Sequence, residues 1–156
     1  MKKSLIYLIL LLSIPYNSSA QKYTETYIKD ANKIGLQWWS DVNSREYDKS
    51  YTKLSTLLKN RFTLENWTYQ MSSLMNEFGS IKNRTITESY FQSELEGFED
   101  GFYVIIEYDV VYSKTRNHTE TLLLKQNDKF QWEIFDFTYT FQTLKENDKM
   151  LKTNQE

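Results

Sequence analysis

The sequence predicts an α+β fold in which N-terminal helices pack on a curved, four-stranded antiparallel meander sheet. Two observations lead to this prediction. Apolar residues recur at helical spacing between residues 27 and 78. Residues 80–141 are instead rich in Thr, Tyr, Phe, Val and Ile, which favour strands. Helices grouped before an antiparallel sheet are typical of the α+β class.

Three helical patterns come first. Their apolar stripes are Tyr27, Ala31, Ile34 and Trp38, then Tyr47, Tyr51, Leu54 and Leu58, and then Leu64, Trp67, Met71, Leu74 and Phe78. Asn43, with Glu46 three residues later, is the predicted start of the second helix. Thr63 is the predicted cap of the third helix, and Gly79 suits its end.

Four strands are expected at roughly 81–93, 102–113, 118–126 and 130–141. In the second, the even positions are apolar (Phe102, Val104, Ile106, Tyr108, Val110, Tyr112), while the odd positions include Glu107 and Asp109. This alternation predicts a half-buried antiparallel strand. In the last strand the aromatic residues change face near Ile134–Asp136, which indicates either a β-bulge there or a strand covered on both faces, and we favour the bulge. Residues 113–118, which include His118, and residues 127–129 are expected to form turns.

The N-terminus has the features of a secretory signal peptide. Lys2 and Lys3 precede an apolar run of about ten residues, which ends before Ser18-Ser19-Ala20. A membrane-spanning helix needs roughly 20 apolar residues, so we expect cleavage after Ala20 rather than anchoring. The predicted organisation is a cleaved signal peptide at 1–20, one α+β domain at 21–141 and a polar, flexible tail at 142–156.

Composition excludes several classes of function. Removing residues 1–20 lowers the net charge from −2 to −4, which disfavours a nucleic-acid or anionic-membrane surface. The chain has no Cys and one His, so the usual zinc sites cannot be built, and its four Gly form no phosphate-binding loop. We expect no cofactor and no metal. The acidic residues of 94–100 lack the spacing of a calcium loop and are interpreted as a solvated hairpin.

Residues 38–139 resemble a bacterial family known as domain of unknown function 4019. Trp38, Asp41, Tyr47, Trp67, Gly79, Arg84, Glu120 and Trp132 carry the resemblance, together with the segment Leu95-Glu96-Gly97-Phe98-Glu99-Asp100-Gly101-Phe102-Tyr103. The family often has Pro where this chain has Glu96. The resemblance implies a fold similar to the cystatin-like and nuclear transport factor 2-like cone folds, an exported protein, and no established reaction. A fold of this kind does not by itself specify a function.

Five residues are candidates for binding a ligand or partner. Arg84 and Glu120 fall on nearby predicted strands, where they would form a structural ion pair or hold a small acid. Glu107 and Asp109 would split acid and base roles, or simply lie on the wet face of the sheet. Trp39 cannot share the core stripe of Trp38, so we expect it near an edge, where it would mark a binding mouth or a dimer contact, or would cover a neighbouring helix.

These observations favour an exported, non-catalytic binding module whose partner is an unknown protein, peptide or small ligand. With no Cys after the signal, it would be periplasmic or extracellular and not lipid-anchored. Two alternatives stay open. One is a cone-fold enzyme in which Glu107, Asp109, Arg84 or a Tyr acts in an internal acid/base pocket, and the other is a homodimer built by sheet-on-sheet packing.

Overall fold

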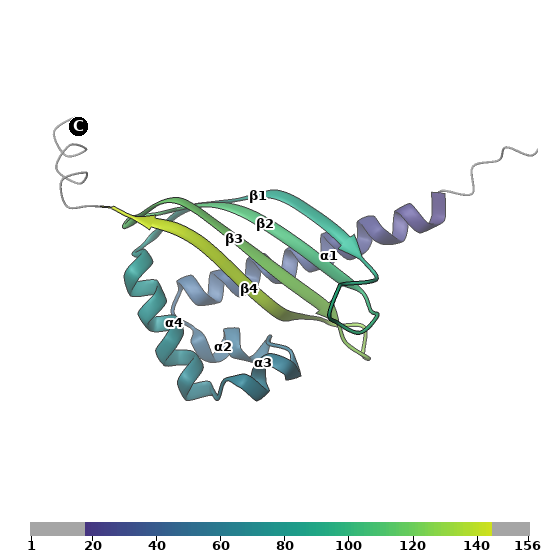
Figure 1. Ribbon diagram of the computed structural model, residues 1–156, viewed down its shortest axis with the longest axis horizontal. Coiled ribbons are helices and arrows are strands. Elements are labelled where there is room, and N and C mark those ends of the chain that lie inside the picture. Colours follow the sequence, from purple (N-terminus) through teal and green to yellow (C-terminus); the bar gives the residue numbers. More distant parts are fainter. Residues whose placement is uncertain (1–17, 145–156) are drawn as a thin grey trace, which may run out of the picture.

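The computed structural model describes residues 18–144. Its helices are α1 (Ser18–Asn43), α2 (Tyr47–Thr52), α3 (Thr56–Arg61) and α4 (Leu64–Phe78), and its strands are β1 (Ile81–Gln92), β2 (Tyr103–Tyr112), β3 (Thr115–Gln126) and β4 (Trp132–Thr143). The strands form one antiparallel sheet in the order β1-β2-β3-β4. α1 runs behind this sheet and α2, α3 and α4 lie on the side of β4 (Figure 1). The predicted α+β class and meander sheet are confirmed.

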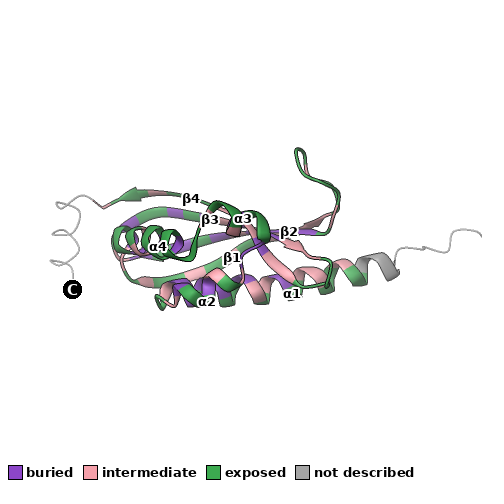
Figure 2. Ribbon diagram, turned by 90° about the horizontal axis from the view of Figure 1, so that it is seen from below, coloured by how far each residue is buried: buried purple, intermediate pink, exposed green. Residues whose placement is uncertain are grey.

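α1 packs its C-terminal half against the sheet, on the side that we call the inner face (Figure 2). The predicted stripe holds for Ala31 and Trp38, which have no exposed surface. The helix approaches closely because residue 35 is glycine. A Cβ atom there would lie 2.8 Å from Tyr108 Oη and 3.0 Å from Ile106 Cδ1. The helix backbone therefore rests directly on side chains of β2.

The second helical pattern does not form one helix, and this expectation was wrong. α2 ends at Thr52 and α3 begins at Thr56, with Leu54 between them in a parallel bridge to Ile134 of β4. Ser55 N donates to Ile134 O at 2.8 Å, and Ile134 N donates to Lys53 O at 2.9 Å. Leu54 and Leu58 are buried as the pattern predicted, because a single continuous helix and the observed break between α2 and α3 both bury them. Pairing with β4 has replaced the helical hydrogen bonds.

The predicted capping residues are confirmed for α4 but not for the second predicted helix. Thr63 Oγ1 accepts a hydrogen bond from Asn66 N at 3.2 Å, and Gly79 ends α4 with φ of 83°, as expected. The expected cap of the second helix is wrong. Asn43 is the last residue of α1, and Glu46 precedes α2 without a capping hydrogen bond from its side chain.

Four rows of residues cross the sheet on its outer face, opposite α1. The register aligns Thr85 with Asp109, Thr119 and Thr140, then Glu88 with Glu107, Thr121 and Thr138, then Tyr90 with Ile105, Leu123 and Asp136, and finally Gln92 with Tyr103, Lys125 and Glu133. No described helix lies in front of the strands in Figure 1, where this face is turned to the viewer. The outer face is therefore open to contact over much of its area.

The predicted bulge in β4 is confirmed. Leu124 pairs with Ile134 whereas Leu123 pairs with Asp136, so Phe135 is the extra residue. After the bulge, Phe137 lies against Trp38 and Trp39 on the inner face. β4 ends at Thr143, two residues beyond the predicted domain end, and residues 145–156 of the predicted tail lie outside the described residues. The predicted signal segment also falls outside them, apart from residues 18–20.

The segment between β1 and β2 folds over one end of the outer face. Tyr103 Oη donates to Glu99 O at 2.7 Å, and Phe98 packs on Phe135 with ring centroids 5.3 Å apart. Tyr103 is fully buried by this cover, although its odd position in β2 predicted a wet face. Phe102, expected in the core, is instead 40% exposed. Because the cover spans only this end, the two halves of β2 differ in burial.

Candidate functional site

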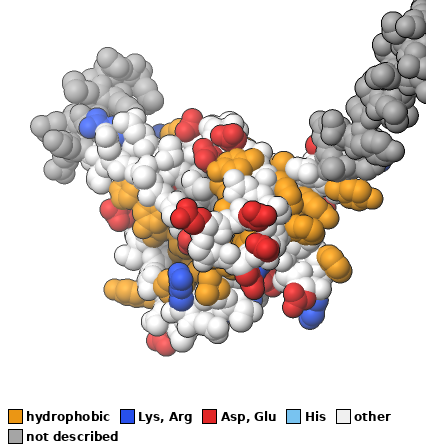
Figure 3. All heavy atoms as spheres, turned by 45° about the vertical axis from the view of Figure 1, so that its right-hand side comes forward, with side chains coloured by type: hydrophobic (Ala, Val, Ile, Leu, Met, Phe, Trp, Pro, Cys, Tyr) orange, Lys and Arg blue, Asp and Glu red, His pale blue; other side chains and the backbone are white. Residues whose placement is uncertain are grey.

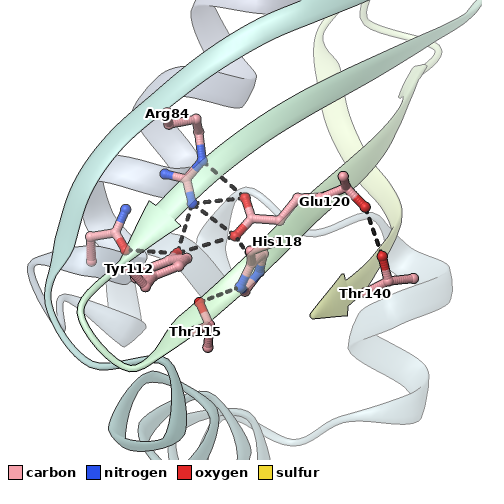
Figure 4. Close-up of polar contacts among 8 residues, drawn as sticks. Arg84, Tyr112, Thr115, His118, Glu120 and Thr140 are labelled. Atoms are coloured by element: carbon pink, nitrogen blue, oxygen red, sulfur yellow. Dashed lines mark hydrogen bonds and ion pairs between the residues drawn. The ribbon is translucent and has the colours of Figure 1, made fainter. Parts of the chain in front are cut away.

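Arg84 of β1 and Glu120 of β3 form an ion pair on the inner face, across the intervening strand β2 (Figure 4). Arg84 Nε donates to Glu120 Oε2 at 2.9 Å and Arg84 Nη2 donates to Glu120 Oε1 at 3.0 Å. The Glu120 side chain has no exposed surface, and that of Arg84 is 8% exposed. A carboxylate bound at both oxygens by one guanidinium has its charge matched within the fold.

Tyr112 extends this pair into a network that reaches α1. Its Oη accepts a hydrogen bond from Arg84 Nη2 at 2.8 Å and lies 3.1 Å from Glu120 Oε1 and 3.2 Å from Asn43 Oδ1. Burial, and then the negative charge of Glu120, raise the pKa of the Tyr112 hydroxyl well above its ordinary value. The hydroxyl therefore keeps its proton, and it links three strands to the end of α1.

His118 lies within β3 and is buried, so its predicted place in a turn was wrong. Its Nδ1 is 3.1 Å from Thr115 Oγ1, and its Nε2 is 3.4 Å from Glu120 Oε1 without a hydrogen bond between them. The ring packs edge-on against Phe78, with centroids 4.4 Å apart. This histidine is a packed core residue beside a carboxylate that Arg84 already engages.

Trp39 completes the same buried cluster. The Arg84 guanidinium carbon lies 4.3 Å from the centroid of the Trp39 ring, which is cation–π distance. Trp39 has no exposed surface, so its expected place at an edge was wrong. Trp39, Arg84 and Glu120 are thus brought together, but as an interior network whose charges satisfy one another.

Glu107 and Asp109 lie elsewhere. Both project from the outer face of β2, where Glu107 is half-buried and Asp109 is exposed. The sheet separates them from Arg84 and Glu120, so an acid/base pocket that combines these four groups is not assembled. Glu107 lies directly opposite Glu88. Burial and then the charges of Glu107 and Glu88 raise the pKa of the neighbouring Tyr90 hydroxyl.

A groove of about 610 Å³ opens at the covered end of the outer face. Its apolar lining comes from Leu57 of α3, from Phe98 and from the bulge residue Phe135. Leu57 is 37% exposed and Phe98 44% exposed, so apolar surface faces the solvent here. Sequence reasoning missed this site, because its walls come from three segments that only the fold brings together. Phe98, inside an acidic segment, was the one available signal.

Charged side chains line the rim of the groove. Lys125 binds the carboxylate of Glu99, and its Nζ lies 5.4 Å from the centroid of Tyr103 and 5.6 Å from that of Phe135. Burial alone would lower the pKa of Lys125, but its interactions with Glu99 and Tyr103 together outweigh burial and raise this pKa. Arg61, Asp128 and Glu133 also line the groove. Figure 3 shows acidic and hydrophobic side chains interspersed on this side of the molecule, with few Lys or Arg.

The described residues contain no group of His, Cys, Asp and Glu arranged to hold a metal ion. Among the same residues, no helix is both long and apolar enough to cross a membrane.

A family described as "Protein of unknown function (DUF4019)" matches residues 34–137. Comparisons with curated proteins and with solved structures gave no match. The similarity to cystatin-like and nuclear transport factor 2-like folds therefore stays a prediction.

Proposed function

Because the chain belongs to the DUF4019 family, whose description states no activity, we propose a function from its surface: an exported, non-catalytic binding module. The groove between α3, the β1–β2 segment and the β3–β4 turn takes an apolar group of the ligand. The observation that carries this proposal is the solvent-facing apolar lining of Leu57, Phe98 and Phe135.

The size and chemistry of the groove support binding. Its volume of about 610 Å³ falls within the roughly 300–1,000 Å³ of ordinary ligand pockets. Exposed aromatic side chains beside a few charged groups are typical of binding surfaces, because apolar contact supplies affinity and the polar rim supplies orientation. Phe98 stands at the edge of the groove with its ring against Phe135, so a ligand can contact both.

The placement of the ionisable groups supports a non-catalytic role. Arg84 and Glu120 neutralise one another in the interior, and Glu107 and Asp109 lie on the opposite face of the sheet. A catalytic acid or base needs access to a bound substrate. None of these four residues lines the groove.

The exported location rests on residues 1–20 alone. It is tested by expressing the full chain in an exporting bacterial host and determining the N-terminus of the purified protein by mass spectrometry. A first residue of Gln21 supports export with cleavage after Ala20. Recovery of the uncut chain in the cytoplasm would overturn it.

The groove is tested with Nile red, a neutral dye that fluoresces in apolar surroundings. We expect saturable binding to the wild-type protein and a loss of affinity of about tenfold in Phe98→Ala, because a half-exposed aromatic contact is removed. Tyr69→Ala is the matched control, since Tyr69 is an aromatic residue of α4 that is 75% exposed and outside the groove lining. Equal effects of the two substitutions would refute the groove as the binding site.

A further inference from the structure

The outer face carries negative charge that the described part of the fold leaves without a partner. Glu88 of β1 and Glu107 of β2 are direct cross-strand neighbours, and Asp109 projects two residues from Glu107 on the same face. No ion pair within residues 18–144 reaches any of the three. Like charges placed directly opposite in a sheet destabilise it. The face therefore keeps an arrangement that costs stability in the isolated chain.

The apolar part of this surface leads from the carboxylates to the groove. The row next to Glu88 and Glu107 contains Tyr90, Leu123 and Ile105, of which the first two are half-buried. Beyond them lie Phe135 and Phe98 of the groove. The outer face thus changes from the carboxylates of Glu107 and Asp109 to buried Ile105, which the half-buried Tyr90 and Leu123 flank.

From this arrangement we infer that the outer face binds an extended, cationic segment of a partner protein, with its apolar end in the groove. The inference rests on the proposed function for that apolar end. Residues two apart in a strand are separated by about 6.8 Å, so Glu107 and Asp109 match lysines at alternate positions of an extended segment. Each such contact would bring a cation to carboxylates that now repel one another.

A second copy of this chain does not fit the same face. Packing two outer faces together would bring Glu88, Glu107 and Asp109 of both copies into one interface, at a cost in binding free energy. Within the four rows named above, Lys125 is the cation, and it already binds Glu99, whereas Arg116 pairs in register with Gln142 outside these rows. Charge complementarity therefore favours a cationic partner over sheet-on-sheet self-association.

The probe is a fluorescein-labelled peptide of about ten residues, with lysine at alternate positions in its first half, leucine at alternate positions in its second, and serine between. Fluorescence anisotropy measures its binding to the protein purified from residue 21 onward. We expect Glu107→Gln and Asp109→Asn each to weaken binding about three- to tenfold, since each removes one charge contact worth about 1 kcal/mol at the surface. Higher ionic strength should weaken wild-type binding as well.

Glu77→Gln provides the control for net charge, because Glu77 is an exposed carboxylate of α4, away from the sheet face. A peptide with glutamate in place of lysine controls for the charge of the probe. Thermal melts add an independent readout: Glu107→Gln should raise the midpoint of unfolding while it weakens peptide binding, because the repulsion with Glu88 is relieved. A merely structural carboxylate would not move the two measurements in opposite directions.

Several outcomes would overturn the inference. These are no binding of the lysine peptide, equal binding of the glutamate peptide, equal weakening by Glu77→Gln and Glu107→Gln, or a dimer in sedimentation that Glu107→Gln strengthens. If Nile red binds the groove but the lysine peptide does not, the proposed groove stands and the cationic partner is excluded. If the peptide binds in a Glu107-dependent way but Phe98→Ala has no effect on Nile red binding, the groove is refuted as the apolar binding site and the cationic partner stands.

Discussion

Arg84 and Glu120 lie two strands apart and still form a bidentate ion pair, because both side chains extend diagonally over β2. Arg84 pairs in register with Val110, whereas Glu120 pairs with Tyr108, so the contact crosses the strand between two successive inner-face positions. The pair therefore reports on the register of three strands at once.

Breaking this pair from one side should be costly. We expect Arg84→Met to lower the free energy of unfolding by about 3–5 kcal/mol, because Glu120 would remain buried and charged without its partner. The double variant Arg84→Met/Glu120→Leu should recover most of that loss, since neither charge is then buried. Urea unfolding of the two single variants and the double variant measures the coupling. Additive losses would show that the two side chains do not act as a pair.

His118 should contribute through packing rather than charge. Its ring contacts Phe78 at 4.4 Å and Tyr112 at 4.9 Å between centroids, and its Nε2 has no hydrogen-bond partner. We expect His118→Phe to change stability by less than about 1.5 kcal/mol and His118→Ala to cost about 2–4 kcal/mol. Chemical denaturation distinguishes the two variants. A loss in His118→Phe as large as in His118→Ala would instead assign the stability to the ring nitrogens.

Gly35→Ala should destabilise the protein, although alanine ordinarily favours a helix over glycine by about 1 kcal/mol. The added Cβ would lie 2.8 Å from Tyr108 Oη, a hydroxyl that is buried without a hydrogen-bond partner. Combining Gly35→Ala with Tyr108→Phe removes the clashing oxygen and should restore much of the lost stability. Thermal melts of the single and double variants test this. A stabilising Gly35→Ala would show that α1 can move away from β2.

Asp41 should make stability depend on pH at the acid end. Burial alone would raise the pKa of its carboxyl, but hydrogen bonds from Lys53 and Gln37 outweigh burial and hold it below its ordinary value of 3.8. The unfolded chain therefore takes up this proton at a higher pH than the folded chain does. The stabilisation that the ionised Asp41 carboxylate gives the folded protein is present above pH 3.8. It is lost as the pH falls through the lower pKa that Asp41 has in the folded state.

Asp41→Asn should lower the free energy of unfolding by about 1–2 kcal/mol at pH 7 and flatten its decline between about pH 5 and 2. Urea unfolding across this range measures both effects. Asp48→Asn is the control, because Asp48 is an exposed residue of α2. An acid decline in Asp41→Asn as steep as in the wild type would assign the pH dependence to other carboxylates.

Local patterns in the sequence predicted the features that depend on short stretches of chain. The change of face at Ile134–Asp136 predicted the bulge, and the spacing of Trp67, Met71 and Phe78 predicted α4. The break at Leu54 was not predictable in this way. Leu54 keeps helical spacing with Leu58, and only its pairing with β4 shows that it lies outside a helix.

The candidate site also depends on contacts between distant segments, which local sequence patterns do not predict. Arg84 and Glu120 were recognised as possible partners, but their contact depends on strand register, which residue types alone do not specify. Trp39 was misplaced because a tryptophan beside the core stripe can reach either solvent or the sheet, and the choice depends on Arg84 from a distant segment. The groove needs α3, Phe98 and Phe135 together. Such convergence is a property of the tertiary fold.

The bridge between Leu54 and Ile134 has a consequence for folding kinetics. The strands of the sheet pair with their neighbours in sequence, whereas this bridge joins the helical half of the chain to the last strand. Contacts between distant segments carry a larger loop-closure cost and tend to form late. We expect Leu54→Ala to accelerate unfolding in stopped-flow experiments with little change in the folding rate. The hydrogen bonds of Ser55 and Ile134 would then open before the sheet does, and their amides would exchange early with solvent.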